Sequence, residues 1–212
     1  ISIMSDSDLK QLNFPQTISD SSIKGIILVE ICDKVVCDAL SQFNLPIVSV
    51  DMPNVPFEEL NGIDVVTMES KKNLKKIINQ LIEKGAESFG FVGDLYSPNV
   101  SRGFQERYNA LSECLAEHQL PLNQKNCLLH QTPEDFRNFQ TTVNNLQAMI
   151  SLPDVFICGN DWTAIQLIYA LQFLGFQIPK DICVVGFDNI PAASRISPSL
   201  TTISTPQKYL GI

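Results

Sequence analysis

The chain has 212 residues, of which 44% are hydrophobic and 18% charged, so it is long and apolar enough to bury a sizeable core. Its formal net charge of −8 argues against the concentrated basic face with which nucleic-acid-binding modules hold a phosphate backbone. The longest apolar runs have the length of strands and fall well short of the roughly 20 residues that a membrane-spanning helix needs, so we expect neither a membrane segment nor a membrane partner.

Short β-branched apolar runs alternate with amphipathic stretches along the chain, a pattern typical of parallel strands joined by helices. In the helix expected over 70–85, Ser70 can cap the N-terminus and Gly85 ends the helix. In the first half of the chain, strands are expected over 1–4, 24–30, 46–50 and 63–67, and helices over 33–43 and 70–85.

The second half continues the alternation. Nine strands would make a wide single sheet for a chain of this length, whereas two smaller sheets would be ordinary in size. The sequence therefore predicts the α/β class, with two Rossmann-like lobes that each contain a parallel sheet. The lobes are expected over 1–86 and 87–200, and 201–212 is expected to return the chain to the first lobe. In the second half, strands are expected over 88–93, 126–130, 154–158, 182–187 and 201–204, and helices over 102–118, 133–150 and 161–175.

Polar side chains follow several of these expected strands. In open parallel sheets ligands bind beyond the carboxyl ends of the strands, where the loops converge. An acid in this position also commonly caps the next helix, and that alternative stays open for each of them. The residues concerned are Asp51, Asp94, the pair Asn160 and Asp161, and the pair Asp188 and Asn189.

Carboxylates and amides accept and donate hydrogen bonds in pairs to neighbouring hydroxyls. A cleft lined with Asp, Asn and one Arg therefore suits a polyol or a sugar better than an anion or an apolar molecule. A divalent cation with oxygen ligands is the alternative. Because no D-x-D or similarly compact acidic cluster occurs among these strand-end residues, we expect no metal site.

Motifs for catalysis and for cofactors are missing from the sequence. It contains no GxGxxG, P-loop, G-x-S-x-G or H-E-x-x-H, and its only histidines are His118 and His130. We expect a protein that is not an enzyme and that needs no cofactor. The six cysteines form no C-x-x-C pair, which favours buried thiols in a reducing cytosol over disulfides or a metal site.

The C-terminal part of the sequence carries six ordered motif elements. In chain order they are the strand DVFIC at 154–158, ND-x-x-A at 160–164, G-x-x-I-P-x-D at 175–181, VVGFD at 184–188, P-x-LTT-I at 198–203 and LG at 210–211. Earlier in the chain, GIILV, LPIVSVD and FGFVGD follow the same order. With these motifs the chain resembles the regulatory core of the lactose-repressor (LacI/GalR) family of bacterial transcription factors over essentially its whole length.

This resemblance implies a two-lobed fold like that of type I periplasmic binding proteins, which closes on a small effector, usually a sugar, its phosphate or a nucleobase. It also implies a cytoplasmic homodimer that binds operator DNA through an N-terminal headpiece outside this chain. The first strand and helix of the N-terminal lobe are likewise expected outside the chain. A sugar-binding protein of an ABC uptake system has the same fold and is the alternative function.

The resemblance also implies roles for particular residues. Asp188 matches the acid that binds effector hydroxyls in relatives, Asn160 and Asp161 match the ND pair, and Asp51 matches the acid that closes the LPxVxxD strand. The effector arginine of the family lies three residues before a glycine on the first helix of the second lobe. Arg107 lies three residues before Ala110, and Arg102 in SRGF is its competitor, so both arginines stay candidates.

The dimer contacts that the resemblance implies lie on the outer face of helix 161–175 and near Ile196. In the alternative interpretation, Ile165, Ile168 and Leu171 of this helix simply pack on their own sheet.

Overall fold

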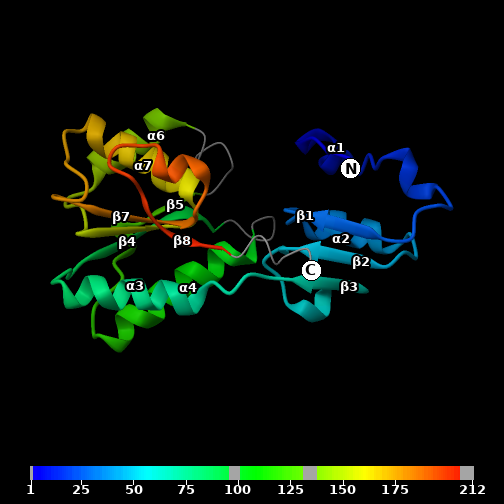
Figure 1. Cartoon of the computed structure of the whole chain (residues 1–212), viewed down its shortest axis with the longest axis horizontal. Coiled ribbons are helices and arrows are strands. Elements are labelled where there is room, and N and C mark those ends of the chain that lie inside the picture. Colours follow the sequence, from blue (N-terminus) through cyan, green and yellow to red (C-terminus); the bar gives the residue numbers. More distant parts are fainter. Residues whose placement is uncertain (1, 96–100, 131–137, 206–212) are drawn as a thin grey trace. The chain divides into compact units, whose positions relative to one another are not determined.

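The computed structural model of the protein describes residues 2–95, 101–130 and 138–205. These residues form two compact units, and each unit contains a parallel sheet (Figure 1). The predicted α/β class with two parallel sheets is therefore confirmed. Among the described residues, no helix combines the length and the hydropathy needed to cross a membrane.

The first unit holds the described residues up to Met68, together with Ser101 and Arg102. Its boundary lies earlier than the predicted residue 86, because helix α3 (Lys71–Glu83) packs its apolar face on the sheet of the second unit. The chain therefore passes into the second unit before this helix and not after it.

Three parallel strands form the sheet of the first unit, in the order β1-β2-β3. One side of this sheet packs on helix α2, where Val36, Cys37 and Leu40 are buried against Leu28 and Ile47. The elements are α1 (Asp6–Gln11), β1 (Ile26–Val29), α2 (Lys34–Ser41), β2 (Ile47–Val50) and β3 (Ile63–Val66), with short 3-10 turns at Gln16–Ser19 and Phe57–Glu59.

The strand predicted over 1–4 is wrong for its described residues, because 2–5 have no regular structure. A strand is stable only when its backbone groups pair with a neighbouring strand, and no strand of the described sheet pairs with this segment. The chain instead begins helix α1 at Asp6, and Ser5 and Asp8 close a reciprocal capping box at its start.

Five parallel strands form the sheet of the second unit, in the order β5-β4-β6-β7-β8. Strand β8 (Thr201–Ser204) pairs with β7, with Asp188 opposite Ser204. This part of the predicted return segment 201–212 therefore belongs to the second unit. The other elements are β4 (Phe89–Asp94), α4 (Arg102–Glu117), β5 (Leu128–His130), α6 (Phe139–Ala148), β6 (Val155–Cys158), α7 (Asp161–Phe173) and β7 (Cys183–Asp188), with 3-10 turns at Gln124–Asn126 and Pro191–Ser194.

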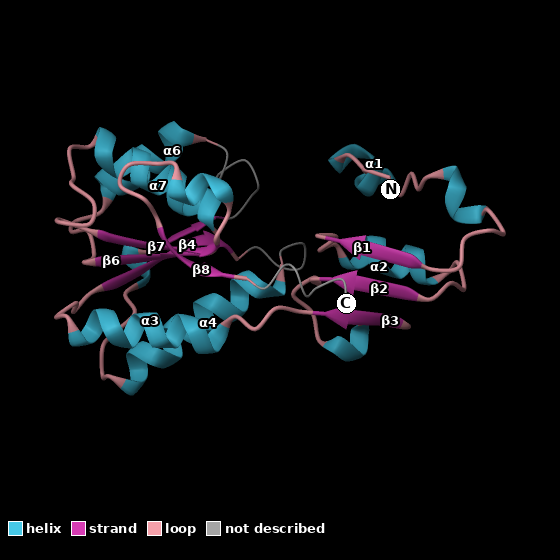
Figure 2. Ribbon diagram, viewed as in Figure 1, coloured by secondary structure: helices cyan, strands magenta, loops and turns pink. Residues whose placement is uncertain are grey.

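Helices cover both faces of this five-stranded sheet, α3 and α4 on one face and α6 and α7 on the other (Figures 1 and 2). Alternate residues of a strand point to opposite faces, so the central strand β6 contributes to both cores. Phe156 and Cys158 pack with α7, whereas Val155 and Ile157 pack with α3 and α4. The sheet is therefore buried on both sides, as parallel sheets are in α/β proteins.

The start of helix α3 differs from the prediction. Ser70 makes no capping hydrogen bond through its side chain, whereas the Glu69 carboxylate accepts hydrogen bonds from the backbone N–H groups of Lys71 (2.8 Å) and Lys72 (2.6 Å). A carboxylate in this place also suits the positive end of the helix dipole. Gly85 has a φ of +96°, as expected for a glycine that ends a helix.

All six cysteines are free thiols in this structure. Cys37, Cys114 and Cys158 are buried, and the other three are half-buried. Burial raises the pKa of the Cys37 thiol from 9.0 to about 11, which keeps this group protonated and unreactive at neutral pH.

Candidate functional site

Asp188 is the last residue of strand β7 and lies at its carboxyl end. Its φ is +111° and that of Asn189 is +55°, so two consecutive residues that are not glycine have a backbone conformation that such residues rarely adopt. The Asp188 side chain is half-buried and that of Asn189 is exposed. Unfavourable backbone geometry of this kind concentrates at functional sites, because the surrounding structure must hold it in place.

The loop after β7 is held by strand β8. The backbone N–H of Asn189 donates a hydrogen bond to the hydroxyl of Thr202 (3.2 Å), and the hydroxyl of Thr205 donates to the carbonyl of Asp188 (3.4 Å). Thr202 of the predicted LTT motif therefore holds Asn189, the residue next to the candidate Asp188, a role that the sequence does not reveal.

Asp161 is fully buried, with 0% of its surface exposed, at the first turn of helix α7. Its Oδ2 accepts a hydrogen bond from the backbone N–H of Ile190 (2.8 Å), and its Oδ1 accepts one from the hydroxyl of Thr202 (2.5 Å). A Cβ at Gly186 would lie 2.2 Å from Oδ1, so this position leaves no space for a larger residue. Asp161 is thus a positioning residue that holds the loop after β7.

Burial raises the pKa of the Asp161 carboxyl above its ordinary value of 3.8, although hydrogen bonds from Thr202 and from the backbone of the loop act in the opposite direction. The cost of desolvating the carboxylate therefore exceeds what these hydrogen bonds return.

Asn160 precedes Asp161 and caps helix α7. Its Oδ1 accepts a hydrogen bond from the backbone N–H of Thr163 at 2.9 Å, and its side chain is half-buried. Capping, which stayed open as an alternative for this pair in the sequence, is therefore the role that the structure shows for Asn160.

Arg107 lies on helix α4 and is 5% exposed. Its Nη1 donates a hydrogen bond to the carbonyl of Gly159 (2.5 Å), which directly precedes Asn160. Its guanidinium also lies over the ring of Phe187, which directly precedes Asp188, with Cζ 3.8 Å from the ring centroid. The fold thus brings Arg107, Asn160, Asp161 and Asp188 to the carboxyl ends of the neighbouring strands β6 and β7.

Asp51 and Arg102, the other two predicted residues, belong to the first unit. Asp51 follows strand β2 with a φ of +70°, and its Oδ2 accepts a hydrogen bond from the hydroxyl of Ser101 (2.5 Å). The Nη1 of Arg102 donates to the carbonyl of Val55 (3.1 Å), and its guanidinium lies 4.5 Å from the ring centroid of Phe57. Asp51 and Arg102 therefore belong to the same unit. Ser101, which bonds Asp51, directly precedes Arg102 in the chain.

A histidine–carboxylate pair also lies at the carboxyl edge of the second sheet. Asp94 and His130 end the paired strands β4 and β5, and their Oδ1 and Nδ1 atoms are 2.7 Å apart. The sequence shows that each of these polar residues closes a strand. Only the pairing of β4 with β5 in the sheet shows that they are neighbours. Among the residues that the structure describes, no group of three or more His, Cys, Asp or Glu side chains could hold a metal ion.

A family model described as "periplasmic binding protein-like domain" matches residues 78–211. Among curated proteins, the catabolite control protein A of Staphylococcus xylosus is 29% identical over 218 residues, which are 99% of this chain and 62% of that protein. The chain thus spans about three fifths or less of the length of the first curated relatives that it matches.

Solved structures share the fold. A regulatory protein of the LacI family from Chloroflexus aggregans superposes with a TM-score of 0.76 at 18% identity, covering 98% of this chain and 72% of that one. A LacI family transcriptional regulator from Lactobacillus casei, solved with bound sucrose, gives a TM-score of 0.71 at 22% identity, covering 96% of this chain and 70% of that one.

Proposed function

Because the chain belongs to the family of periplasmic binding protein-like domains, we propose that it is the effector-binding core of a transcriptional regulator of the LacI/GalR type. The resemblance to that family, predicted from the motifs between Asn160 and Ile203, is confirmed by the named relatives and solved structures. The two solved structures are described as a regulator and a regulatory protein, and the curated relative as a control protein, which favours this function over a sugar-binding protein of an uptake system and over an enzyme.

The observation that carries the proposal is the shared strand edge in the second unit. Arg107, Asn160 and Asp188 come from three different elements and lie around the carboxyl ends of β6 and β7. This is where open parallel sheets bind their ligands. We assign direct effector contact to Asp188, with Arg107 beside it, and a positioning role to Asp161, which is fully buried.

We propose a sugar or related polyol as the effector. The half-buried carboxylate of Asp188 can accept hydrogen bonds from the hydroxyls of such a ligand, and the exposed amide of Asn189 can both accept and donate them. The sucrose in the Lactobacillus casei structure supports this class, because that regulator shares the fold. Asp51 is the candidate contact from the first unit, with Arg102 next to it.

We further propose that the protein acts as a homodimer through the outer face of helix α7. Trp162, Tyr169 and Phe173 are spaced seven and four residues apart, so they lie on one face of the helix, and they are 59%, 47% and 68% exposed. Phe139 of α6 extends this face, since its ring packs edge-on against Phe173 at 6.0 Å. Exposed aromatic side chains gathered in this way are typical of protein interfaces.

Other predicted dimer residues have a different role. Ile165, Ile168 and Leu171 are buried in the core of the second unit, and Ile196 packs against the same core. The alternative interpretation of these three α7 residues is therefore the correct one.

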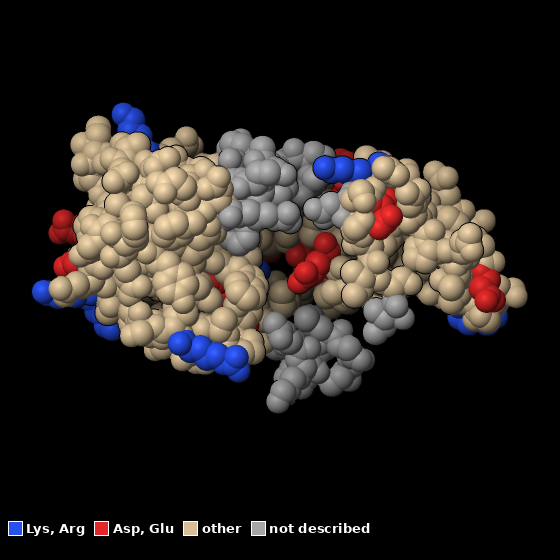
Figure 3. All heavy atoms as spheres, turned by 90° about the horizontal axis from the view of Figure 1, so that it is seen from above, with Lys and Arg blue, Asp and Glu red and all other residues tan. Residues whose placement is uncertain are grey.

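Operator binding is proposed for the full-length regulator and not for residues 1–212 alone. The net charge is −8, and on the face drawn in Figure 3 the described Lys and Arg side chains lie in small separate groups without a broad basic patch. A phosphate backbone needs such a patch. A headpiece would supply it, and effector binding would alter operator affinity through a coupling of about 1–3 kcal/mol.

A thermal-shift screen of this chain against sugars, sugar phosphates and nucleobases tests the effector class. A ligand present at about 100 times its Kd stabilises the folded state by about 2.7 kcal/mol, which raises Tm by about 5–11 °C for a chain of this size. We expect this shift with at least one sugar. A shift with nucleobases alone would contradict the sugar class, and no shift with any compound would contradict the effector-binding function.

A further inference from the structure

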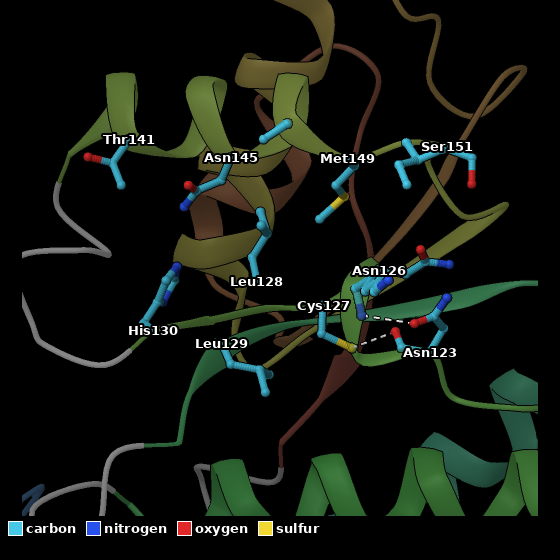
Figure 4. A pocket seen from close by; sticks show the side chains of 13 residues that line it. Asn123, Asn126, Cys127, Leu128, Leu129, His130, Thr141, Asn145, Met149 and Ser151 are labelled. Carbon is cyan, nitrogen blue, oxygen red and sulfur yellow. Dashed lines mark hydrogen bonds between the residues drawn. The ribbon is translucent and has the colours of Figure 1, made fainter.

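A groove with a volume of about 890 Å³ lies between strand β5 and helix α6 in the second unit (Figure 4). Thr141 and Asn145 are one turn apart on α6 and line one wall together with Met149. Leu128 of β5 lies on the opposite wall, and Asn126 lies toward one end. The volume falls within the range of about 300–1,000 Å³ that is usual for small-molecule sites.

This groove is separate from the edge that carries Asp188. Strands β4 and β6 lie between β5 and β7 in the sheet. With neighbouring strands about 4.8 Å apart, β5 and β7 are about 14 Å from each other. A ligand along β5 would therefore occupy a different place from an effector at the end of β7.

The charge of the groove contrasts with that of the whole chain. The chain has 23 acidic and 15 basic residues, yet none of the described residues that line the groove is Asp or Glu. Lys125 is the one Lys or Arg among the described residues of this lining, and its side chain is exposed. The lining therefore does not suit a cation.

Amide and hydroxyl groups dominate the polar part of the lining. Within the described parts of the chain, the side chains of Asn126, Asn145, Thr141 and Ser151 make no hydrogen bond. Each of these groups both donates and accepts hydrogen bonds, whereas an anion requires donors and a cation requires acceptors. Groups that donate and accept in equal measure match the hydroxyls of a neutral polyol.

We propose that this groove is a second binding site, which takes a neutral carbohydrate of about disaccharide size. The Asn145 and Thr141 side chains would bond its hydroxyls from α6, and Asn126 would bond them from the end of the groove. Leu128 and Met149 would pack against the C–H faces of its rings. The proposal stands whether or not the effector at Asp188 is a sugar.

NMR titration of the whole chain labelled with ¹⁵N tests this site, with sucrose, maltose and glucose as probes. We expect the side-chain amide signals of Asn126 and Asn145 to shift with at least one of the disaccharides. Asn145→Leu should weaken the binding about tenfold, as expected for the loss of one or two hydrogen bonds. Asn144→Leu is the matched control, because Asn144 is the next residue of α6, does not line the groove and bonds Gln140 (2.8 Å).

Four outcomes would overturn the proposal. The first is that the amide signals of Asn126 and Asn145 do not shift with any of the three sugars, and the second is that Asn145→Leu and Asn144→Leu weaken sugar binding equally. The third is that these signals shift with inorganic phosphate and not with the sugars. The fourth is that Asp188→Ala abolishes the shift with sugar. The third outcome would identify an anion site at Lys125. The fourth would assign the signals to the effector site, so the Asp188 variant separates failure here from failure of the proposed function.

Discussion

The guanidinium of Arg107 lies over the ring of Phe187, 3.8 Å from its centroid, and Phe187 is the residue before Asp188. A cation from helix α4 thus packs on the strand end that carries the candidate effector carboxylate. Its Nη1 at the same time bonds the carbonyl of Gly159 at the end of β6. One buried side chain therefore ties together the ends of two neighbouring strands.

Replacing Arg107 with Met should lower the free energy of unfolding by about 2–4 kcal/mol. The change removes one hydrogen bond from a charged donor, worth about 1.5–3 kcal/mol, and a cation–π contact worth about 0.5–1 kcal/mol. Urea denaturation of the two proteins measures the difference. Arg195→Met is the control, because Arg195 is exposed. Equal stability of the Arg107 variant and the wild type would show that these contacts contribute nothing.

Asp161→Ala should destabilise the second unit by about 2–6 kcal/mol. The substitution leaves the N–H of Ile190 and the hydroxyl of Thr202 without their acceptor, at about 1–3 kcal/mol for each buried donor. Denaturation monitored by circular dichroism gives the value. A loss below about 0.5 kcal/mol would mean that the loop after β7 does not depend on Asp161.

The raised pKa of Asp161 also predicts how stability depends on pH. Because the folded protein holds this proton more tightly than the unfolded chain, the carboxyl favours folding at low pH. That contribution is lost as the pH rises from 3.8, the ordinary pKa, through the higher folded pKa. The wild type should therefore lose stability relative to Asp161→Asn over this interval. A constant difference between the two proteins would contradict the raised pKa.

The strands and helices follow the sequence closely where an apolar run is bounded by turn residues. Strand β8 has the predicted bounds, β6 starts one residue later than predicted, and β7 is shifted by one residue at both ends. Local pattern is sufficient here because each run is buried in the sheet. Of the helix predicted over 133–150, the structure describes α6, whereas 131–137 lie outside the described residues.

The roles of the candidate site residues were less predictable. Asp161 and Asp188 both follow a buried strand in the sequence, yet one is fully buried and the other half-buried. The difference arises because the loop after β7 folds over Asp161, with Ile190 and Thr202 bonding its carboxylate. Such contacts join residues about 30 and 40 positions apart, and no local pattern reports them.

Association through α7 predicts a further result. Phe173→Glu places a charge in the middle of the exposed aromatic face and should convert the dimer to a monomer, because an unpaired charge is costly to bury in an interface. Analytical ultracentrifugation measures the change. Val35→Glu in the first unit, at a residue that is 60% exposed, should leave the association unchanged. A wild-type chain that sediments as a monomer would contradict the proposed dimer.

Calorimetric titration of Asp188→Ala with the sugar that stabilises the wild type tests the account most directly. Asp64→Ala, at an exposed acid of the first sheet, is the control. Loss of two hydrogen bonds to a charged acceptor, at about 1.5–3 kcal/mol each, predicts that the affinity falls about a hundredfold or more while the fold stays intact. An unchanged affinity in Asp188→Ala would contradict the placement of the effector at the end of β7.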